Sequence, residues 1–135
     1  MAVDIPLPDG LVCREVFRVG EEHVAKGIGS GDVEVLSTPS MVMFMEVTAF
    51  RCVQGYLPEG YTTVGYSLDI KHLNPAPLGA EIDVEARLVA REGRRLVFSV
   101  RASWRGVVVG EGTHERYIVD RKRFLDKVRR LAGQG

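Results

Sequence analysis

The segment TPSMVMFMEVTAFRCVQ, from Thr38 to Gln54, decides the fold of this chain. Its first two residues predict a helix start, because a hydroxyl caps the free amides of a helix and proline fits the first helical position. Gly55 follows the segment and marks its end. Apolar residues occupy nearly every side of the predicted helix, so we expect it to be central and enclosed by the rest of the fold.

Glu46 is the only charged residue between Glu34 and Arg51. A carboxylate buried in such a stretch is costly unless it is paired, hydrogen-bonded or protonated. A purely solvated role is therefore disfavoured, and Glu46 is the first candidate for a functional residue. His72 is the second candidate, because it ends a strand-like run of alternating residues.

Strand-like alternation lies on both sides of the predicted helix. One strand precedes it, over residues 11–19, and the polar, glycine-rich residues 20–32 predict a flexible loop. The later strands are predicted over residues 61–72, 80–90, 95–104 and 107–119. Turn signals at residues 92–93 and 105–106 indicate that successive strands are antiparallel.

A short helix is predicted at the end of the chain, over residues 121–131. Its expected buried side holds Phe124, Leu125, Val128 and Leu131. The basic residues of this helix are interrupted by Asp126, so they indicate a solvated helix face.

Composition narrows the classes of function. The 135 residues fit one domain, residues 1–135, and the 18 basic and 18 acidic residues cancel, which argues against nucleic-acid or anionic membrane partners. No leader pattern or membrane-spanning segment is recognised, so we expect a cytoplasmic protein. Cys13 and Cys52 have no metal-ligand spacing and give no disulfide framework, so we expect two reduced, buried thiols.

One strand, a central helix and four antiparallel strands is the element order of the hot-dog fold, an α+β class in which a curved antiparallel sheet wraps a long helix. The chain resembles the hot-dog thioesterases related to fluoroacetyl-CoA thioesterase, from about Val35 to Lys127. The matching pieces are VLST (35–38), Met45-Glu46, Gly65 seven residues before His72, PLG (77–79), EGRRL (92–96) and GTHER (112–116).

The resemblance implies hydrolysis of an acyl-CoA. By this resemblance, Thr38, Glu46 and His72 form the catalytic group, and Gly65 and Arg116 lie at the substrate. It implies no metal and no cofactor besides the CoA of the substrate. The alternative is a module of the same fold that binds an acyl-CoA or another small ligand without catalysis, since fold alone does not fix function.

Strand periodicity supports a role for His72. Regular alternation over residues 61–72 places Val64, Tyr66 and His72 on one face and Gly65 on the other. The apolar face must pack on the central helix, so His72 should lie near Glu46, where a histidine and a carboxylate exchange protons near neutral pH. The alternative is a structural pair or a hydrogen-bonded core histidine.

Thr38 and Glu46 lie eight residues apart, which is ~12 Å of helix rise. They cannot hydrogen-bond to each other within one helix. Hot-dog domains commonly pair, so we expect a homodimer with the site at its interface. The alternative role of Thr38 is that of a helix cap alone.

Arg116 stands at the end of a strand whose face also carries Gly110 and Gly112. A face so poor in side chains leaves room for a ligand, and a guanidinium suits an anionic CoA ester. The alternative is an ion pair across the sheet. His114 shares this face, and we expect it to be a surface or supporting residue.

The acyl group is not fixed by the resemblance. In the fluoroacetyl-selective member, the segment before the central helix carries aromatic residues that close over the substrate. The corresponding residues here, 27–32, read GIGSGD. We therefore expect a small or medium acyl-CoA other than fluoroacetyl-CoA.

Overall fold

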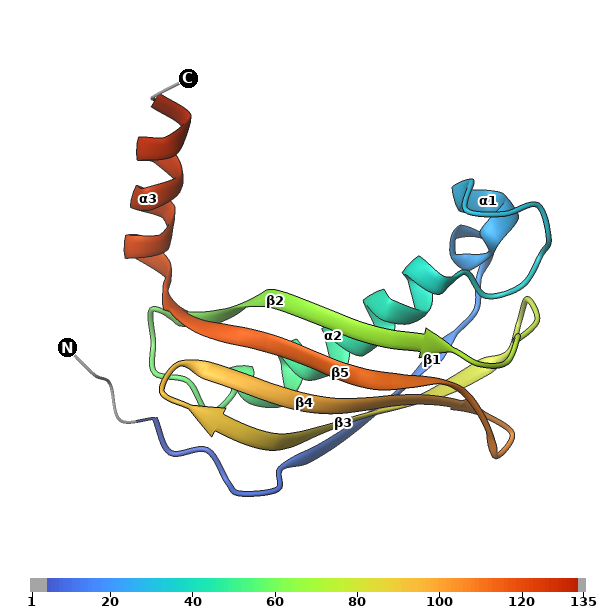
Figure 1. Ribbon diagram of the computed structural model, residues 1–135, viewed down its shortest axis with the longest axis horizontal. Coiled ribbons are helices and arrows are strands. Elements are labelled where there is room, and N and C mark those ends of the chain that lie inside the picture. Colours follow the sequence, from blue (N-terminus) through green and yellow to red (C-terminus); the bar gives the residue numbers. More distant parts are fainter. Residues whose placement is uncertain (1–4, 134–135) are drawn as a thin grey trace.

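The computed structural model describes residues 5–133, which form an antiparallel five-stranded sheet with one long helix across one face (Figure 1). The strand order is β1-β3-β4-β5-β2, so β1 and β2 are the edges. The strands are β1 (Val12–Arg18), β2 (Tyr61–His72), β3 (Glu81–Glu92), β4 (Arg95–Trp104) and β5 (Val107–Asp120). The helices are α1 (Ala25–Ile28), α2 (Thr38–Gln54) and α3 (Arg121–Gly133), with a 3-10 turn, η1, at Glu21–His23. The predicted element order is confirmed.

The core lies between α2 and the sheet, because both bury one apolar face there. On β3 the alternate residues Ile82, Val84 and Ala86 are buried, and on α2 Met41 and Phe44 are buried against them. The expectation that α2 is enclosed on all sides is wrong. Met43 and Phe50, on the side of α2 that carries Glu46, are exposed.

The start of α2 is capped by Ser37, not by Thr38 as expected. The Ser37 hydroxyl accepts a hydrogen bond from the Ser40 amide at 3.1 Å. Thr38 is therefore the first residue inside the helix, with Pro39 after it. Because the cap is already made, the Thr38 hydroxyl is free to bond elsewhere.

The glycine-rich segment before α2 is not the plain loop that was expected. It folds into η1 and α1 and is held at two points, by bridges between Val24 and Leu36 and between Val35 and Pro77. These bridges fix the entry to α2 and place the residues before Thr38 beside the connection between β2 and β3.

A β-bulge at Tyr66 changes which residues of β2 face the helix. The pairing of β2 with β5 runs Gly65 with Arg116 and then Ser67 with Glu115, which leaves Tyr66 unpaired. The extra residue shifts the alternation, as bulges do. Gly65 and His72 therefore both face α2, and the predicted placement of Gly65 on the opposite face is wrong.

Cys13 and Cys52 form a disulfide, contrary to the prediction of two reduced thiols. They lie 39 residues apart in the sequence, with 5.6 Å between their Cα atoms. Sequence spacing gave no sign of this pairing because it depends on α2 crossing edge strand β1. The bond ties that strand to the last turn of the central helix.

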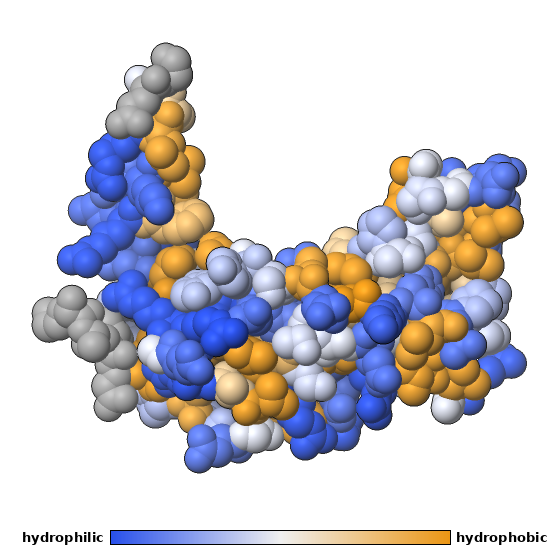
Figure 2. All heavy atoms as spheres, viewed as in Figure 1, coloured by the Kyte–Doolittle hydropathy of each residue, from blue (hydrophilic) through white to orange (hydrophobic). Residues whose placement is uncertain are grey.

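The helix α3 stands away from the sheet (Figure 1), and its hydrophobic side is in view in Figure 2. None of its residues is buried. Phe124, Leu125, Val128 and Leu131 are between 38% and 60% exposed, so the prediction that they form a buried side is wrong for the chain by itself.

Candidate active site

The predicted site residues lie on the facing surfaces of α2, β2 and β5, in two groups. Thr38 and His72 form one group, which we call the hydroxyl–imidazole pair. The other group contains Glu46, Gly65, His114 and Arg116, and we call it the carboxylate cluster. His114 is the one member that the sequence did not assign to the site.

The hydroxyl–imidazole pair joins the first residue of α2 to the last residue of β2. Thr38 Oγ1 lies 2.8 Å from His72 Nδ1. The other ring nitrogen, Nε2, is buried and has no hydrogen-bond partner among the described residues. Burial lowers the pKa of His72 below its usual value, so the neutral imidazole is favoured near pH 7. A neutral ring beside a hydroxyl is able to accept a proton.

Arg116 organises the carboxylate cluster. It is only 6% exposed, and its Nε donates to Thr63 Oγ1 at 2.8 Å while Nη2 donates to the Thr63 carbonyl at 3.1 Å. Its Nη1 lies 3.8 Å from Glu46 Oε2. The guanidinium also lies over the ring of Phe50, at 5.6 Å. These contacts fix Arg116 from several directions.

His114 is fully buried, which excludes the surface position and leaves the supporting role, the other expectation for this residue. Its Nε2 lies 3.2 Å from Arg116 Nη1, and its Nδ1 lies 2.9 Å from the Ser67 carbonyl. Arginine only donates hydrogen bonds, so His114 Nε2 is the acceptor. The ring proton is therefore on Nδ1, which donates to the Ser67 carbonyl. Burial lowers the pKa of His114, which agrees with this neutral form. Its position two residues before Arg116 on one strand face was the available sequence signal.

Glu46 is less enclosed than the sequence indicated, with 40% of its side chain exposed. It lies directly over Gly65: a Cβ placed on Gly65 would be 2.9 Å from Glu46 Oε2. The missing side chain of Gly65 makes room for the Glu46 carboxylate. The group that closely approaches Gly65 is therefore a side chain of the same protein chain.

Gly110 and Gly112 do not leave an open face. A Cβ on Gly110 would meet Met41 Sδ at 2.4 Å, and one on Gly112 would meet the Asp69 carbonyl oxygen at 2.0 Å. The space is filled by α2 and by the backbone of β2. The argument that this bare strand face receives a ligand is therefore wrong, and the case for Arg116 depends on its contact with Glu46.

The structure brings Thr38 to His72 and Glu46 to Arg116, but no hydrogen bond among the described residues joins the two groups. Gly65 and His72 are seven positions apart on β2, and Thr38 and Glu46 are about two turns apart on α2. The expected direct proximity of His72 and Glu46 is not found within one chain.

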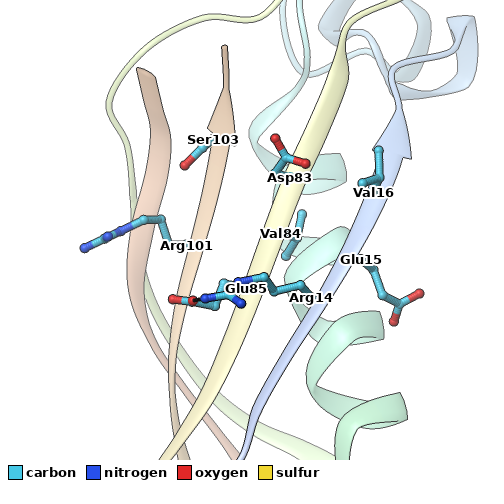
Figure 3. Close-up of a pocket in the computed structure, with 8 residues that line it drawn as sticks. All are labelled: Arg14, Glu15, Val16, Asp83, Val84, Glu85, Arg101 and Ser103. Atoms are coloured by element: carbon cyan, nitrogen blue, oxygen red, sulfur yellow. Dashed lines mark hydrogen bonds and ion pairs between the residues drawn. The ribbon is translucent and has the colours of Figure 1, made fainter. Parts of the chain in front are cut away.

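A second surface feature, on the strands away from the predicted site residues, is a hollow lined by charged side chains. A hollow of about 480 Å³ lies over β1, β3 and β4, where Arg14 forms an ion pair with Glu85 at 2.8 Å (Figure 3). None of the predicted site residues lines it. Within residues 5–133 there is no group of three or more side chains suited to hold a metal ion. No helix in this range is both long and apolar enough to cross a membrane.

A curved antiparallel sheet wrapped on a central helix is the architecture of the hot-dog fold. Residues 19–122 match the family of fluoroacetyl-CoA-specific thioesterases. The chain belongs to this family of thioester hydrolases, and its α+β hot-dog fold agrees with the prediction.

The fluoroacetyl-CoA thioesterase of Streptantibioticus cattleyicolor is 35% identical over 102 residues, 76% of this chain and 73% of that protein. A solved structure of the fluoroacetyl-CoA thioesterase FlK has a TM-score of 0.86 at 29% identity, over 93% of this chain and 97% of that one. A thioesterase superfamily member from Thermus thermophilus has a TM-score of 0.89 at 28% identity, over 96% of each chain. A mutant of FlK was solved with fluoroacetate and CoA, and it matches with a TM-score of 0.82 at 28% identity, over 87% of this chain and 99% of that one.

Proposed function

We propose that this protein hydrolyses the thioester of a small or medium acyl-CoA, releasing the free acid and CoA. The observation that carries the proposal is the 2.8 Å contact between Thr38 Oγ1 and His72 Nδ1, made by a threonine that its helix does not need as a cap. Membership of the thioesterase family supports it. No metal or cofactor takes part in the proposed reaction.

The proposed roles follow from the chemistry of each side chain. Glu46 acts as the nucleophile or as the base for water, since its carboxylate is partly open to a substrate and is paired with Arg116. His72 transfers the proton that the leaving thiolate requires. Thr38, bonded to His72, orients the water or the thioester carbonyl. Gly65 and Arg116 keep the carboxylate in place beside the substrate.

We also propose that the enzyme is a homodimer in which each site uses both copies. The outer edge of β2 is unpaired in the described chain, and Tyr66, Leu68, Met43 and Phe50 are exposed near it. An exposed apolar edge of this kind is normally covered. Antiparallel pairing of β2 with a second copy carries the His72 end of one strand toward the Gly65 region of the other, which would join the two groups.

The acyl group is proposed to differ from fluoroacetyl. No aromatic residue occurs between His23 and Phe44, so the segment through α1 has no aromatic ring to close over a substrate. The large hydrophobic side chains exposed there are Ile28 and Val33. They suit a short aliphatic acyl chain.

The proposed location is the cytoplasm, where an acyl-CoA substrate would be met. The Cys13–Cys52 disulfide argues for an oxidising site instead. Fractionation of the native cell, with thiol labelling of the recovered protein, decides between them. We expect the protein in the cytoplasmic fraction, with Cys13 and Cys52 protected from the label by their disulfide.

A panel of CoA esters from acetyl to aryl tests the activity. Purified protein should release free thiol from at least one short or branched ester. The absence of turnover above background on the whole panel would contradict the proposal. Saturable binding of an ester without hydrolysis would support the alternative, a non-catalytic binding module.

Mixing two inactive variants tests the shared site. Glu46→Gln supplies an intact hydroxyl–imidazole pair, and the double variant Thr38→Val/His72→Gln supplies an intact carboxylate cluster. If each site uses both copies, a random 1:1 mixture should recover about a quarter of wild-type activity, because half of the dimers are mixed and each holds one complete site. A mixture that exchanges subunits but stays inactive would show that each site belongs to one chain.

A further inference from the structure

The helix α3 has an apolar stripe that its own chain leaves uncovered. The stripe consists of Phe124, Leu125, Val128 and Leu131. Elsewhere in α3 the side chains are mostly charged, and none of the helix is buried among the described residues. A helix of this length is marginal in water without tertiary packing, so the stripe requires a partner.

The position of α3 relative to β2 limits what that partner is. Tyr61 pairs with Asp120, and α3 begins at the next residue, so the helix rises at the Tyr61 end of the unpaired edge. The segment around α1 rises at the other end of that edge (Figure 1). The hydrophobic side of α3 is turned toward the hollow between them (Figure 2).

A second copy that pairs its β2 antiparallel with this edge fills that hollow. Antiparallel pairing sets the Tyr61 end of one copy beside the His72 end of the other. The residues that follow His72 in the second copy are then the nearest surface to α3. This step rests on the homodimer proposed above.

We propose that the α3 stripe of each copy docks on the β2–β3 connection of the other, at Leu73 and Leu78. Both leucines are exposed in the single chain. Leu78 also borders a hollow of about 380 Å³ with Val24, Lys26 and the carboxylates Glu21 and Glu34. The proposed seat is therefore partly apolar, with two carboxylates and one ammonium group at its rim.

The charge of α3 complements that rim. Its basic residues are Arg121, Lys122, Arg123, Lys127, Arg129 and Arg130. Asp126 is the only acidic residue of the helix. An apolar stripe flanked by cations matches a partly apolar seat with two carboxylates at its rim, and such charges favour one orientation of docking. The match is reciprocal, as a two-fold dimer requires.

Paired variants test the stripe in the full-length protein. Leu125→Gln/Val128→Gln should raise the dimer dissociation constant about tenfold or more in sedimentation equilibrium, because two apolar contacts are lost. The control is Val16→Gln/Val89→Gln, which changes two valines that are more exposed than Leu125 and Val128 and lie on and near the opposite edge, and it should leave dissociation unchanged. An α3 variant with wild-type dissociation would overturn the docking proposal while the homodimer stands.

Cross-linking tests the seat itself. Two differently tagged chains are mixed, one with Val128→Cys and the other with Leu78→Cys, and oxidised. A disulfide that joins the two tags is expected. Its absence in a confirmed dimer overturns the assigned seat. A single chain that carries both changes is oxidised as a second sample, and a disulfide that forms only within that chain also overturns the seat. A wild-type protein that is monomeric overturns the dimer and this docking together, while thiol release from acyl-CoA tests catalysis independently.

Discussion

The hydroxyl–imidazole pair and the carboxylate cluster are built in opposite ways. The pair consists of one hydrogen bond between the ends of α2 and β2, with Thr38 exposed. In the cluster, buried Arg116 is fixed by Thr63 and His114 before it meets Glu46. The difference indicates that the cluster sets the position of a carboxylate in advance, whereas in the pair the Thr38 side stays exposed.

The largest effect is expected at the carboxylate. Glu46→Gln keeps the shape of the side chain but removes its charge, so kcat for the best CoA ester should fall about 100-fold or more. Glu59→Gln, an exposed change in a turn, is the matched control and should keep full activity. Full activity of the Glu46 variant would assign this residue to structure.

A smaller effect is expected when the cluster is disturbed from the strand side. In Gly65→Ala the new methyl group would lie 2.9 Å from Glu46 Oε2, so the carboxylate must move. Turnover should fall about tenfold, because small displacements of a reacting group are costly. The melting temperature should change little, since a flexible side chain can yield.

Gly55→Ala is the control for this change, because Gly55 has a helical backbone and open space around it. It should leave both turnover and stability close to wild type. A Gly65 variant with unaltered kinetics would show that the position of the carboxylate is not critical, and would remove the contrast between the two groups.

At the hydroxyl–imidazole pair, the expected loss of activity corresponds to the free energy of about one hydrogen bond. Thr38→Val should lower kcat roughly tenfold through loss of the contact with His72. Thr38→Ser keeps a hydroxyl and should retain most of the activity. If both variants behave alike, the hydroxyl has no part in the reaction and Thr38 serves the helix only.

The smallest effect is on the pH dependence of stability. Burial lowers the pKa of His114, so the folded protein keeps it neutral while the unfolded chain takes up a proton near 6.5. This histidine therefore adds no pH dependence well above pH 6.5, and the free energy of unfolding falls as the pH drops below that value. Urea unfolding at pH 8, 6.5 and 5.5 should show a shallower decline for His114→Gln than for wild type. An equal decline would place the dependence on other groups.

Much of the fold could be predicted from the sequence because its signals are local. The helix Thr38–Gln54 and the strand Tyr61–His72 match the predicted bounds, since proline, glycine and strict alternation mark their ends. The Cys13–Cys52 bond could not be predicted, because it depends on the packing of elements far apart in the sequence.

The site was predicted less completely than the fold. Thr38, Glu46 and His72 stood out by their residue types, but the way they are grouped depends on a helix cap and a bulge. Ser37 and Thr38 both carry a hydroxyl that could cap the helix, and the sequence does not show which one does. In the structure the cap is Ser37. His114 was missed because a histidine on a strand reads as a surface residue until its neighbours are known.

The bulge at Tyr66 has a consequence for the spacing of the site residues along the chain. In a regular strand, two residues point to the same side only when an even number of steps separates them. Gly65 and His72 are seven steps apart, an odd number, and both face α2. The odd spacing of two residues that face the same helix is thus the sign of the bulge, and it is recognised only once their common orientation is known. A strand that lost the bulge but kept all its residues would turn the glycine or the histidine to the outer face of the sheet, even with every site residue unchanged.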